Sequence, residues 1–223
     1  MADSILLASA SPRRRELLKS MGIDFEVLSA DVDESLRDAL SARDRVIALA
    51  RDKAEAAALR PGALPFRWIL AADTLVWLPA EAGSMAGSPT GDGEGEAEEV
   101  FGKPRDREDA RRMLSRLSGR AHRVSTGLCL LDRVGGGAEV SRSDSSVWFE
   151  GLDDGMLEAA LEAGDWVGVA GAYRIQGYAA RHIERIEGSW SGIVGLPIHE
   201  LYGILSKSGF VFPPSFEANE SGA

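Results

Sequence analysis

Residues 4–17 read Ser-Ile-Leu-Leu-Ala-Ser-Ala-Ser-Pro-Arg-Arg-Arg-Glu-Leu and predict a buried strand that turns directly into an amphipathic helix. Pro12 suits the first helical position, because the N–H that proline lacks has no partner there. The free N–H groups of a helix N-terminus, with serine hydroxyls and guanidinium groups beside them, bind anions. The turn therefore predicts a polyphosphate site at the edge of a sheet. The alternative for Arg13 and Arg14 is that they only solvate the helix.

Composition narrows the class of protein. The chain has 223 residues, 44% of them hydrophobic, which is enough for one compact domain or two small lobes that share a sheet. No apolar run approaches the length of a membrane span, and the N-terminus lacks the features of a signal peptide. The single cysteine, Cys129, excludes a disulfide framework and favours the cytoplasm. A net charge of −10 argues against nucleic acid as a partner, whereas local arginine clusters suit a small polyanion.

Segments with a helical apolar pattern alternate along the chain with segments that have the pattern of a strand. This order predicts an α/β fold with a mixed sheet. The expected helices are 12–21, 41–59, 106–118, 153–162 and 197–208, and the expected strands are 5–8, 25–29, 68–72, 76–78, 122–131, 139–149 and 183–186. A glycine run at 135–137 joins two of these strands as an antiparallel hairpin. Residues 79–100 are rich in glycine, serine and acidic side chains, so we expect a mobile loop there. The tail beyond Pro213 should be loose.

Acidic side chains follow two of the predicted strands. Asp31, Asp33 and Glu34 come after one strand, and Asp73 ends another, where α/β proteins commonly bind ligands. Carboxylates gathered in this way suit Mg²⁺ or Mn²⁺, and one of them can take a proton from an attacking water. The alternative is that they are ordinary loop formers and helix caps.

Three further features suit a nucleotide. Lys103 lies in a constrained turn and Lys53 borders the buried face of a helix, although either side chain could only snorkel to solvent. Residues 171–177 have glycine at both ends, and the Gln176 amide can both donate and accept at the edge of a base. Thr74 offers a hydroxyl beside Asp73. A second glycine-rich loop, 188–197, either closes over a substrate or simply links a strand to a helix.

Together these motifs resemble the Maf family from about residue 5 to 205. The motifs that carry the resemblance, in family order, are Ser9-Ala-Ser11-Pro12-Arg13-Arg14, Asp31-Val-Asp33-Glu34, Ala71-Ala72-Asp73-Thr74, Gly102-Lys103-Pro104, Leu117-Ser118-Gly119, residues 171–177 and Gly195-Leu-Pro197. The resemblance implies a Maf/ITPase-like fold, in which helices flank an elongated twisted mixed sheet and two lobes enclose a central cleft. It also implies a single domain over residues 1–212, interrupted by the acidic insertion at 79–100 and followed by a flexible tail at 213–223.

The resemblance further implies a nucleoside triphosphate pyrophosphatase, which converts a nucleoside triphosphate and water to the monophosphate and pyrophosphate with Mg²⁺ or Mn²⁺. The resemblance also suggests a homodimer, and the family has been linked to septum formation. By position, Asp73, Glu34 and Lys53 become catalytic residues, with Glu34 and Asp73 as metal ligands. The residues expected to bind substrate are Ser9, Ser11, Arg13, Arg14, Thr74, Lys103 and Gln176, of which Arg13, Thr74 and Gln176 match the positions that set base preference.

The Ile-Gln-Gly sequence ending at Gly177 resembles the branch that acts on dTTP and UTP. The chain departs from the family pattern at the 79–100 insertion and at Arg174, where a glycine is common. Three other functions stay open: a 7-methyl-GTP pyrophosphatase, a regulator of cell division that binds nucleotide without turnover, and a general phosphatase that releases orthophosphate. The pyrophosphatase requires that the serine–arginine turn and Asp73 face one cleft.

Overall fold

The computed structural model describes residues 3–79 and 98–213. Most of the predicted mobile insertion (79–100) and nearly all of the predicted tail (213–223) lie outside the described residues. The helices are α1 (Pro12–Ser20), α2 (Ala42–Ala58), α3 (Arg107–Leu117), α4 (Asp154–Glu162), α5 (Trp190–Val194) and α6 (Ile198–Ser208), with 3-10 turns η1 (Glu34–Arg37), η2 (Pro61–Ala63), η3 (Ala170–Ala172) and η4 (Tyr178–His182). The strands are β1 (Ile5–Leu7), β2 (Phe25–Val27), β3 (Trp68–Leu78), β4 (Glu99–Phe101), β5 (Ala121–Asp132), β6 (Gly137–Phe149) and β7 (Ile183–Glu187).

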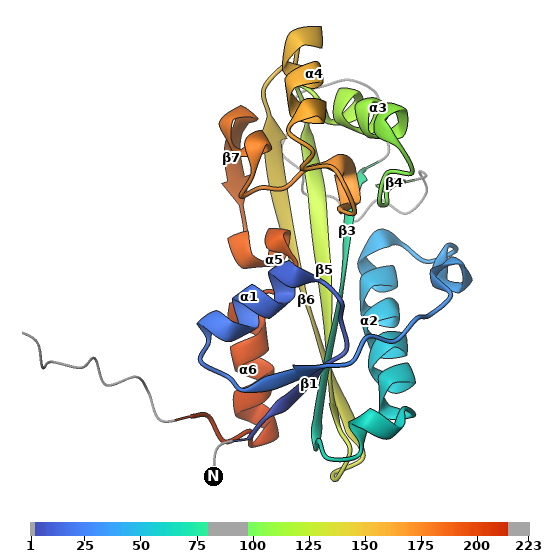
Figure 1. Ribbon diagram of the computed structural model, residues 1–223, viewed down its shortest axis with the longest axis vertical. Coiled ribbons are helices and arrows are strands. Elements are labelled where there is room, and N and C mark those ends of the chain that lie inside the picture. Colours follow the sequence, from blue (N-terminus) through green and yellow to red (C-terminus); the bar gives the residue numbers. More distant parts are fainter. Residues whose placement is uncertain (1–2, 80–97, 214–223) are drawn as a thin grey trace, which may run out of the picture.

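One mixed sheet organises the molecule, in the order β2-β1-β3-β5-β6-β7, with β4 also paired to β3. Strand β1 runs parallel to β2 and β3, whereas the other pairs are antiparallel. The long strands β3, β5 and β6 extend through both halves of an elongated molecule (Figure 1). Helices α1, α2 and α6 cover the lower half, and α3 and α4 lie in the upper half (Figure 1). The expected mixed α/β fold is therefore confirmed.

One edge of β3 is interrupted. Strand β5 pairs with β3 continuously from Trp68 to Trp77, so β1 and β4 must both pair with the opposite edge. There β1 contacts residues 68–70 and β4 contacts residues 76–78. Within the described chain, residues 71–75 have no strand on that edge. At about 3.3 Å per residue, the open edge is roughly 16 Å long.

The open edge explains an error in the sequence prediction. The pattern predicts two strands, 68–72 and 76–78, with Asp73 at the end of the first; the structure has one continuous strand. Asp73 and Thr74 lie in its middle, opposite Gly127 and Thr126 of β5. Polar residues are tolerated there because the neighbouring edge holds a cavity instead of a strand. The sequence analysis also missed β4 and α5, which are three and five residues long.

Helix α2 lies directly against β3 and β5. Its buried stripe includes Val46, Leu49 and Ala50. Gly127 allows this close approach, because a Cβ atom at that position would lie 2.3 Å from the carbonyl oxygen of Val46. Lys53 is two helical turns beyond Val46, on the same face of α2. None of the helices in residues 3–79 and 98–213 combines the length and hydrophobicity needed to cross a bilayer.

Candidate active site

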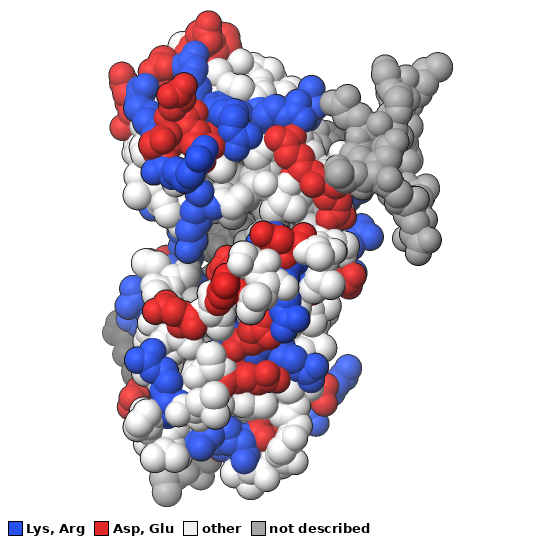
Figure 2. Space-filling model, turned by 90° about the vertical axis from the view of Figure 1, so that its right-hand side faces the viewer, with Lys and Arg blue, Asp and Glu red and all other residues white. Residues whose placement is uncertain are grey.

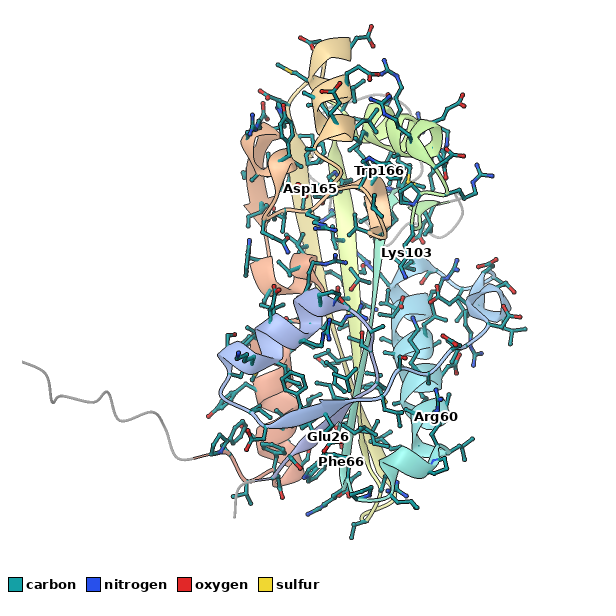
Figure 3. All side chains as sticks on the ribbon, viewed as in Figure 1. Glu26, Arg60, Phe66, Lys103, Asp165 and Trp166 are labelled. Atoms are coloured by element: carbon teal, nitrogen blue, oxygen red, sulfur yellow. The ribbon has the colours of Figure 1, made fainter. Side chains whose placement is uncertain are left out.

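A cavity of about 560 Å³ lies at the open edge of β3. Its wall comes from both halves of the molecule, including the β1–α1 turn, α2, and the loop between η3 and η4. Figure 2 shows a hollow between the two halves, on a face where acidic and basic side chains are interspersed. In Figure 3, Lys103 lies at the junction of the halves, above the N-terminal end of α2. All ten predicted site residues line the cavity: Ser9, Ser11, Arg13, Arg14, Glu34, Lys53, Asp73, Thr74, Lys103 and Gln176.

Lys53 joins two carboxylates at the floor of the cavity. Its Nζ atom donates to Asp73 Oδ1 at 2.5 Å and to Glu34 Oε1 at 2.7 Å. The Asp73 side chain is 8% exposed and that of Lys53 is 15% exposed, whereas Glu34 is half exposed. Helix α2, strand β3 and η1 therefore meet at one ammonium group, which offsets the charge of two acids.

The carboxylate of Asp73 is almost completely buried, which is unusual for an aspartate. Burial raises its pKa, an effect that the nearby charges of Lys53 and Arg14 oppose. The second carboxylate oxygen, Oδ2, is buried and has no hydrogen-bond partner among the described residues. A buried carboxylate with one unsatisfied oxygen can accept a proton from a water molecule that enters the cavity.

Arg14 connects three segments around the cavity. Its guanidinium donates to Gly195 O at 2.8 Å, to Ser9 Oγ at 3.0 Å and to Thr74 Oγ1 at 3.1 Å. Burial lowers the pKa of Arg14, and the charge of Asp73 acts against that shift. The serine–arginine turn and Asp73 thus face the same cleft, as the pyrophosphatase hypothesis requires.

Two arginines approach each other from opposite halves of the molecule. Burial lowers the pKa of Arg13, and the like charge of Arg174 lowers it further. Both side chains line the cavity, with Gln176 exposed on the same loop as Arg174. Arg174 has an ion pair of 3.9 Å with Asp165. This concentration of positive charge favours an anionic ligand.

The structure separates the acidic residues predicted near Glu34. Asp31 lines the cavity, but Asp33 caps η1, where it accepts from Ser35 N at 3.1 Å and from Ser35 Oγ at 2.6 Å. For Asp33, the alternative of an ordinary cap is therefore the correct one. Asp73 also differs from expectation, because it reaches the cavity from the middle of a strand instead of its end.

Two carboxylates of the cavity provide oxygen atoms of the kind that hold a divalent cation. Across the described part of the chain, no three side chains of His, Cys, Asp or Glu gather as a metal site. Asp73 and Glu34 nevertheless meet at Lys53, and Asp73 Oδ2 is unsatisfied. In proteins Mg²⁺ is typically held by one or two carboxylates, substrate phosphates and water. The two carboxylates are compatible with that arrangement.

Sequence reasoning missed two residues that shape the site, Thr126 and Gly127, and noted a third, Gly171, only as one end of a glycine-bounded turn. Thr126 lies opposite Thr74, and its Oγ1 is 2.9 Å from Thr74 Oγ1. Gly127 lies opposite Asp73 and lets α2 approach the sheet. Gly171 has a φ of 71° and lies so close to Val76 that a Cβ would be 2.9 Å from its Cγ1. Their roles depend on strand register and close packing, so only the glycine-rich character of residues 171–177 gave a sequence signal.

Comparisons with known proteins agree with the geometry. Residues 4–208 match the family model described as Maf-like protein. A dTTP/UTP pyrophosphatase of Chromobacterium violaceum is 42% identical over 214 residues, covering 94% of this chain and 96% of its own. Another so named, from Geotalea uraniireducens, is 41% identical and covers 94% and 97%. A third, from Treponema denticola, is 42% identical and covers 92% and 97%.

Among solved structures, the Staphylococcus aureus Ham1 protein aligns with a TM-score of 0.47 and 16% identity, over 92% of this chain and 100% of that chain.

Proposed function

The chain belongs to the family of Maf-like proteins, and from that premise we propose that it hydrolyses dTTP and UTP to the nucleoside monophosphate and pyrophosphate. Relatives named dTTP/UTP pyrophosphatase match more than nine-tenths of the chain at about 40% identity. The observation that carries the proposal is the Lys53 contact with Asp73 and Glu34 at the open edge of β3. It supplies a general base and a positive charge in one cavity.

In this proposal the cationic side chains bind the triphosphate. Lys53, Lys103 and the arginines of the β1–α1 turn line the cavity and offset the negative charge of the phosphates. Ser9 and Ser11 add hydroxyl groups at the N-terminus of α1. Holding the substrate in this way places a phosphoryl group beside the water that the base deprotonates, so the loss of translational and rotational freedom occurs on binding and not in the chemical step.

Asp73 takes the proton of the attacking water. Its raised pKa brings the carboxylate closer to neutral pH, where a general base works best. The positive charge of Lys53 beside the carboxylate opposes that rise and favours the ionised form of Asp73. A divalent cation, Mg²⁺ or Mn²⁺, would be held by Glu34 and Asp73 and would offset charge on the phosphate oxygens.

The direct test is a product assay with a panel of nucleotides. Purified protein is incubated with Mg²⁺ or Mn²⁺ and dTTP, UTP, CTP, GTP or 7-methyl-GTP, and pyrophosphate and orthophosphate are measured separately. We expect dTTP and UTP to be the preferred substrates, with pyrophosphate as the released product. Orthophosphate as the primary product would indicate a phosphatase, preferred turnover of 7-methyl-GTP would indicate the other branch, and binding without turnover would indicate a regulator.

Asp73→Asn tests the assigned base within the same assay. We expect turnover to fall by about 10²–10⁴-fold, the usual contribution of a general base. Glu55→Gln is the matched control, because Glu55 is an exposed carboxylate on α2 that pairs with Arg51 outside the cavity lining. Equal loss in both variants would show that the effect of Asp73→Asn is not specific to the site.

The cellular setting follows from the substrate. We propose the cytoplasm, where nucleoside triphosphates are abundant and a buried thiol such as Cys129 stays reduced. A homodimer and a part in septum formation are proposed on the family resemblance alone. Light scattering of the purified protein measures the oligomeric state directly.

A further inference from the structure

A buried polar pair lies beneath the loop that carries Gln176. His122 of β5 is fully buried, and its Nε2 atom is 2.8 Å from the hydroxyl oxygen of Tyr173. Tyr173 is buried as well, and it belongs to the same loop as Gln176. Tyr173 lines the cavity, whereas His122 lies outside the cavity lining. The pair therefore connects the interior of the sheet to one wall of the candidate site.

Three aromatic rings fix the geometry of this connection. The ring of Phe149 contacts His122 edge-on, with 5.1 Å between the centroids and 87° between the planes. Tyr173 packs against both rings, 4.9 Å from Phe149 and 5.4 Å from His122. Edge-to-face contacts at these distances are favourable and orient each ring. The orientation of the Tyr173 ring then directs its hydroxyl group to His122.

The backbone directly before Tyr173 is strained. Ala172 has a φ of 61°, in the left-handed region that a side chain disfavours, and within residues 3–79 and 98–213 no other residue except glycine has a positive φ. A strained conformation persists only where the surrounding structure holds it, and such strain is typical of functional sites. On one side of Ala172, the amide of Gly171 donates to the carbonyl oxygen of Gly102 at 3.2 Å. On the other side, the holding contact is the Tyr173 hydroxyl.

The polar pair is not the most stable way to fill this part of the core. The Nδ1 atom of His122 is buried and has no hydrogen-bond partner among the described residues. A buried polar atom without a partner costs free energy, and apolar rings of similar size would avoid that cost. A contact that costs stability, next to a strained segment at the wall of a cavity, indicates a role in shaping the site.

We propose that His122 is a positioning residue, which acts through the Tyr173 hydroxyl to hold residues 171–176 in the conformation that presents Gln176 to the nucleotide. This inference rests on the proposed function. Gln176 is exposed and lines the cavity, so its position depends on the backbone that carries it. Without the contact to His122, the strained segment relaxes and moves Gln176 away from the ligand.

The chemical step depends on other elements. Asp73 lies on β3 and Lys53 lies on α2, and the contact between them does not involve residues 171–176. Nucleotide binding and the chemical step can therefore be separated in kinetic measurements. A displaced loop raises KM and leaves kcat nearly unchanged, because it removes binding that substrate and transition state share. A loss of folded protein instead lowers kcat and leaves KM unchanged.

His122→Phe and Tyr173→Phe each remove one partner of the contact and keep a ring in its place. We expect either substitution to raise KM for UTP by about tenfold and to change kcat by less than about threefold. The double variant should raise KM no further than either single variant, whereas independent contributions would multiply to about a hundredfold. Tyr173→Phe deletes a single oxygen atom, so it tests the inference even if His122→Phe does not fold. Ile204→Val is the control, because this buried residue of α6 lies outside the cavity lining and its loss of stability should leave KM unchanged.

Ala172→Gly tests the strain directly. Glycine adopts a positive φ without strain, so adding Ala172→Gly to Tyr173→Phe should return KM to within about threefold of the unmodified value. An unchanged KM in folded Tyr173→Phe, a fall in kcat at constant KM, a hundredfold effect in the double variant or no recovery with Ala172→Gly would overturn the inference. Failure of the unmodified protein to release pyrophosphate from any nucleotide would instead refute the proposed function.

Discussion

Replacing Gly127 with alanine tests whether the sheet and α2 are as closely packed as the site requires. A Cβ atom there would lie 2.3 Å from Val46 O, 2.5 Å from Val46 C and 2.7 Å from Ile47 N. All three are backbone atoms of α2, so no side-chain rotation relieves the contact. Ordinary contact begins at 3.4 Å, so the helix has to move by about 1.1 Å, the difference between 3.4 and 2.3 Å.

This displacement has a cost in stability that can be measured. Overpacking of this kind costs about 1–3 kcal/mol. For a chain of this size each kcal/mol lowers the melting temperature by about 2–4 °C, so we expect a decrease of about 2–12 °C in a calorimetric melt. Gly203→Ala is the control, because nothing lies within 4 Å of a Cβ at that helical position. It should be neutral or stabilising.

The same movement should reduce activity. Lys53 is carried on α2, and its 2.5 Å contact with Asp73 would open as the helix leaves the sheet. A misplacement of about 1 Å near reacting groups can cost on the order of 10²-fold in rate. A Gly127→Ala protein with the melting temperature and kcat of the unmodified protein would refute the proposed packing of α2 on the sheet.

Three further substitutions test the electrostatics of the structure. Lys53→Met removes a positive charge that keeps the pKa of Asp73 from rising further. That pKa should therefore rise, and the acid limb of the plot of kcat/KM against pH should move to higher pH. An unmoved limb would contradict the role of Asp73 as the base. Burial lowers the pKa of His122 to about 3, so the folded protein keeps the ring neutral while the unfolded chain is protonated below about 6.5. The free energy of unfolding, measured in urea, should therefore fall as the pH falls from 6.5 toward 3, and His122→Gln should flatten that slope. Arg14→Lys cannot maintain all three hydrogen bonds of the guanidinium and should lower the free energy of unfolding by about 1.5–3 kcal/mol in a denaturant titration, whereas unchanged stability would show that these bonds contribute little.

The sequence allowed much of the fold to be predicted, because long elements carry their own periodic pattern. The apolar stripe of α2 and the glycine-marked hairpin of β5 and β6 are examples. The short elements β4 and α5 were missed, since three to five residues hold too little pattern. Asp73 was placed at a strand end because polar residues usually stop a buried strand. Here they face an open sheet edge, which arises from pairing between distant segments.

The candidate site was predicted from residue types together with the resemblance to the Maf family, and the structure brings all ten of those residues to one cavity. Local sequence could not reveal Thr126 or Gly127, because their contributions depend on the register of β5 against β3. Each lies more than fifty positions along the chain from the residue it faces. For Asp33 the sequence left both alternatives open, because a capping aspartate and a ligand-binding aspartate look alike in a loop after a strand; the structure shows the cap.

The central claim is that the open edge of β3 binds the nucleotide with its phosphates toward Lys53 and its base toward Thr74. A crystal structure with a dUTP analogue whose α–β bridge is an imido group measures this directly. We predict the analogue in the gap between β1 and β4, with a phosphate oxygen near Lys53 Nζ and the base near Thr74 and Gln176. An analogue bound outside that gap, or with base and phosphates exchanged, would contradict the account.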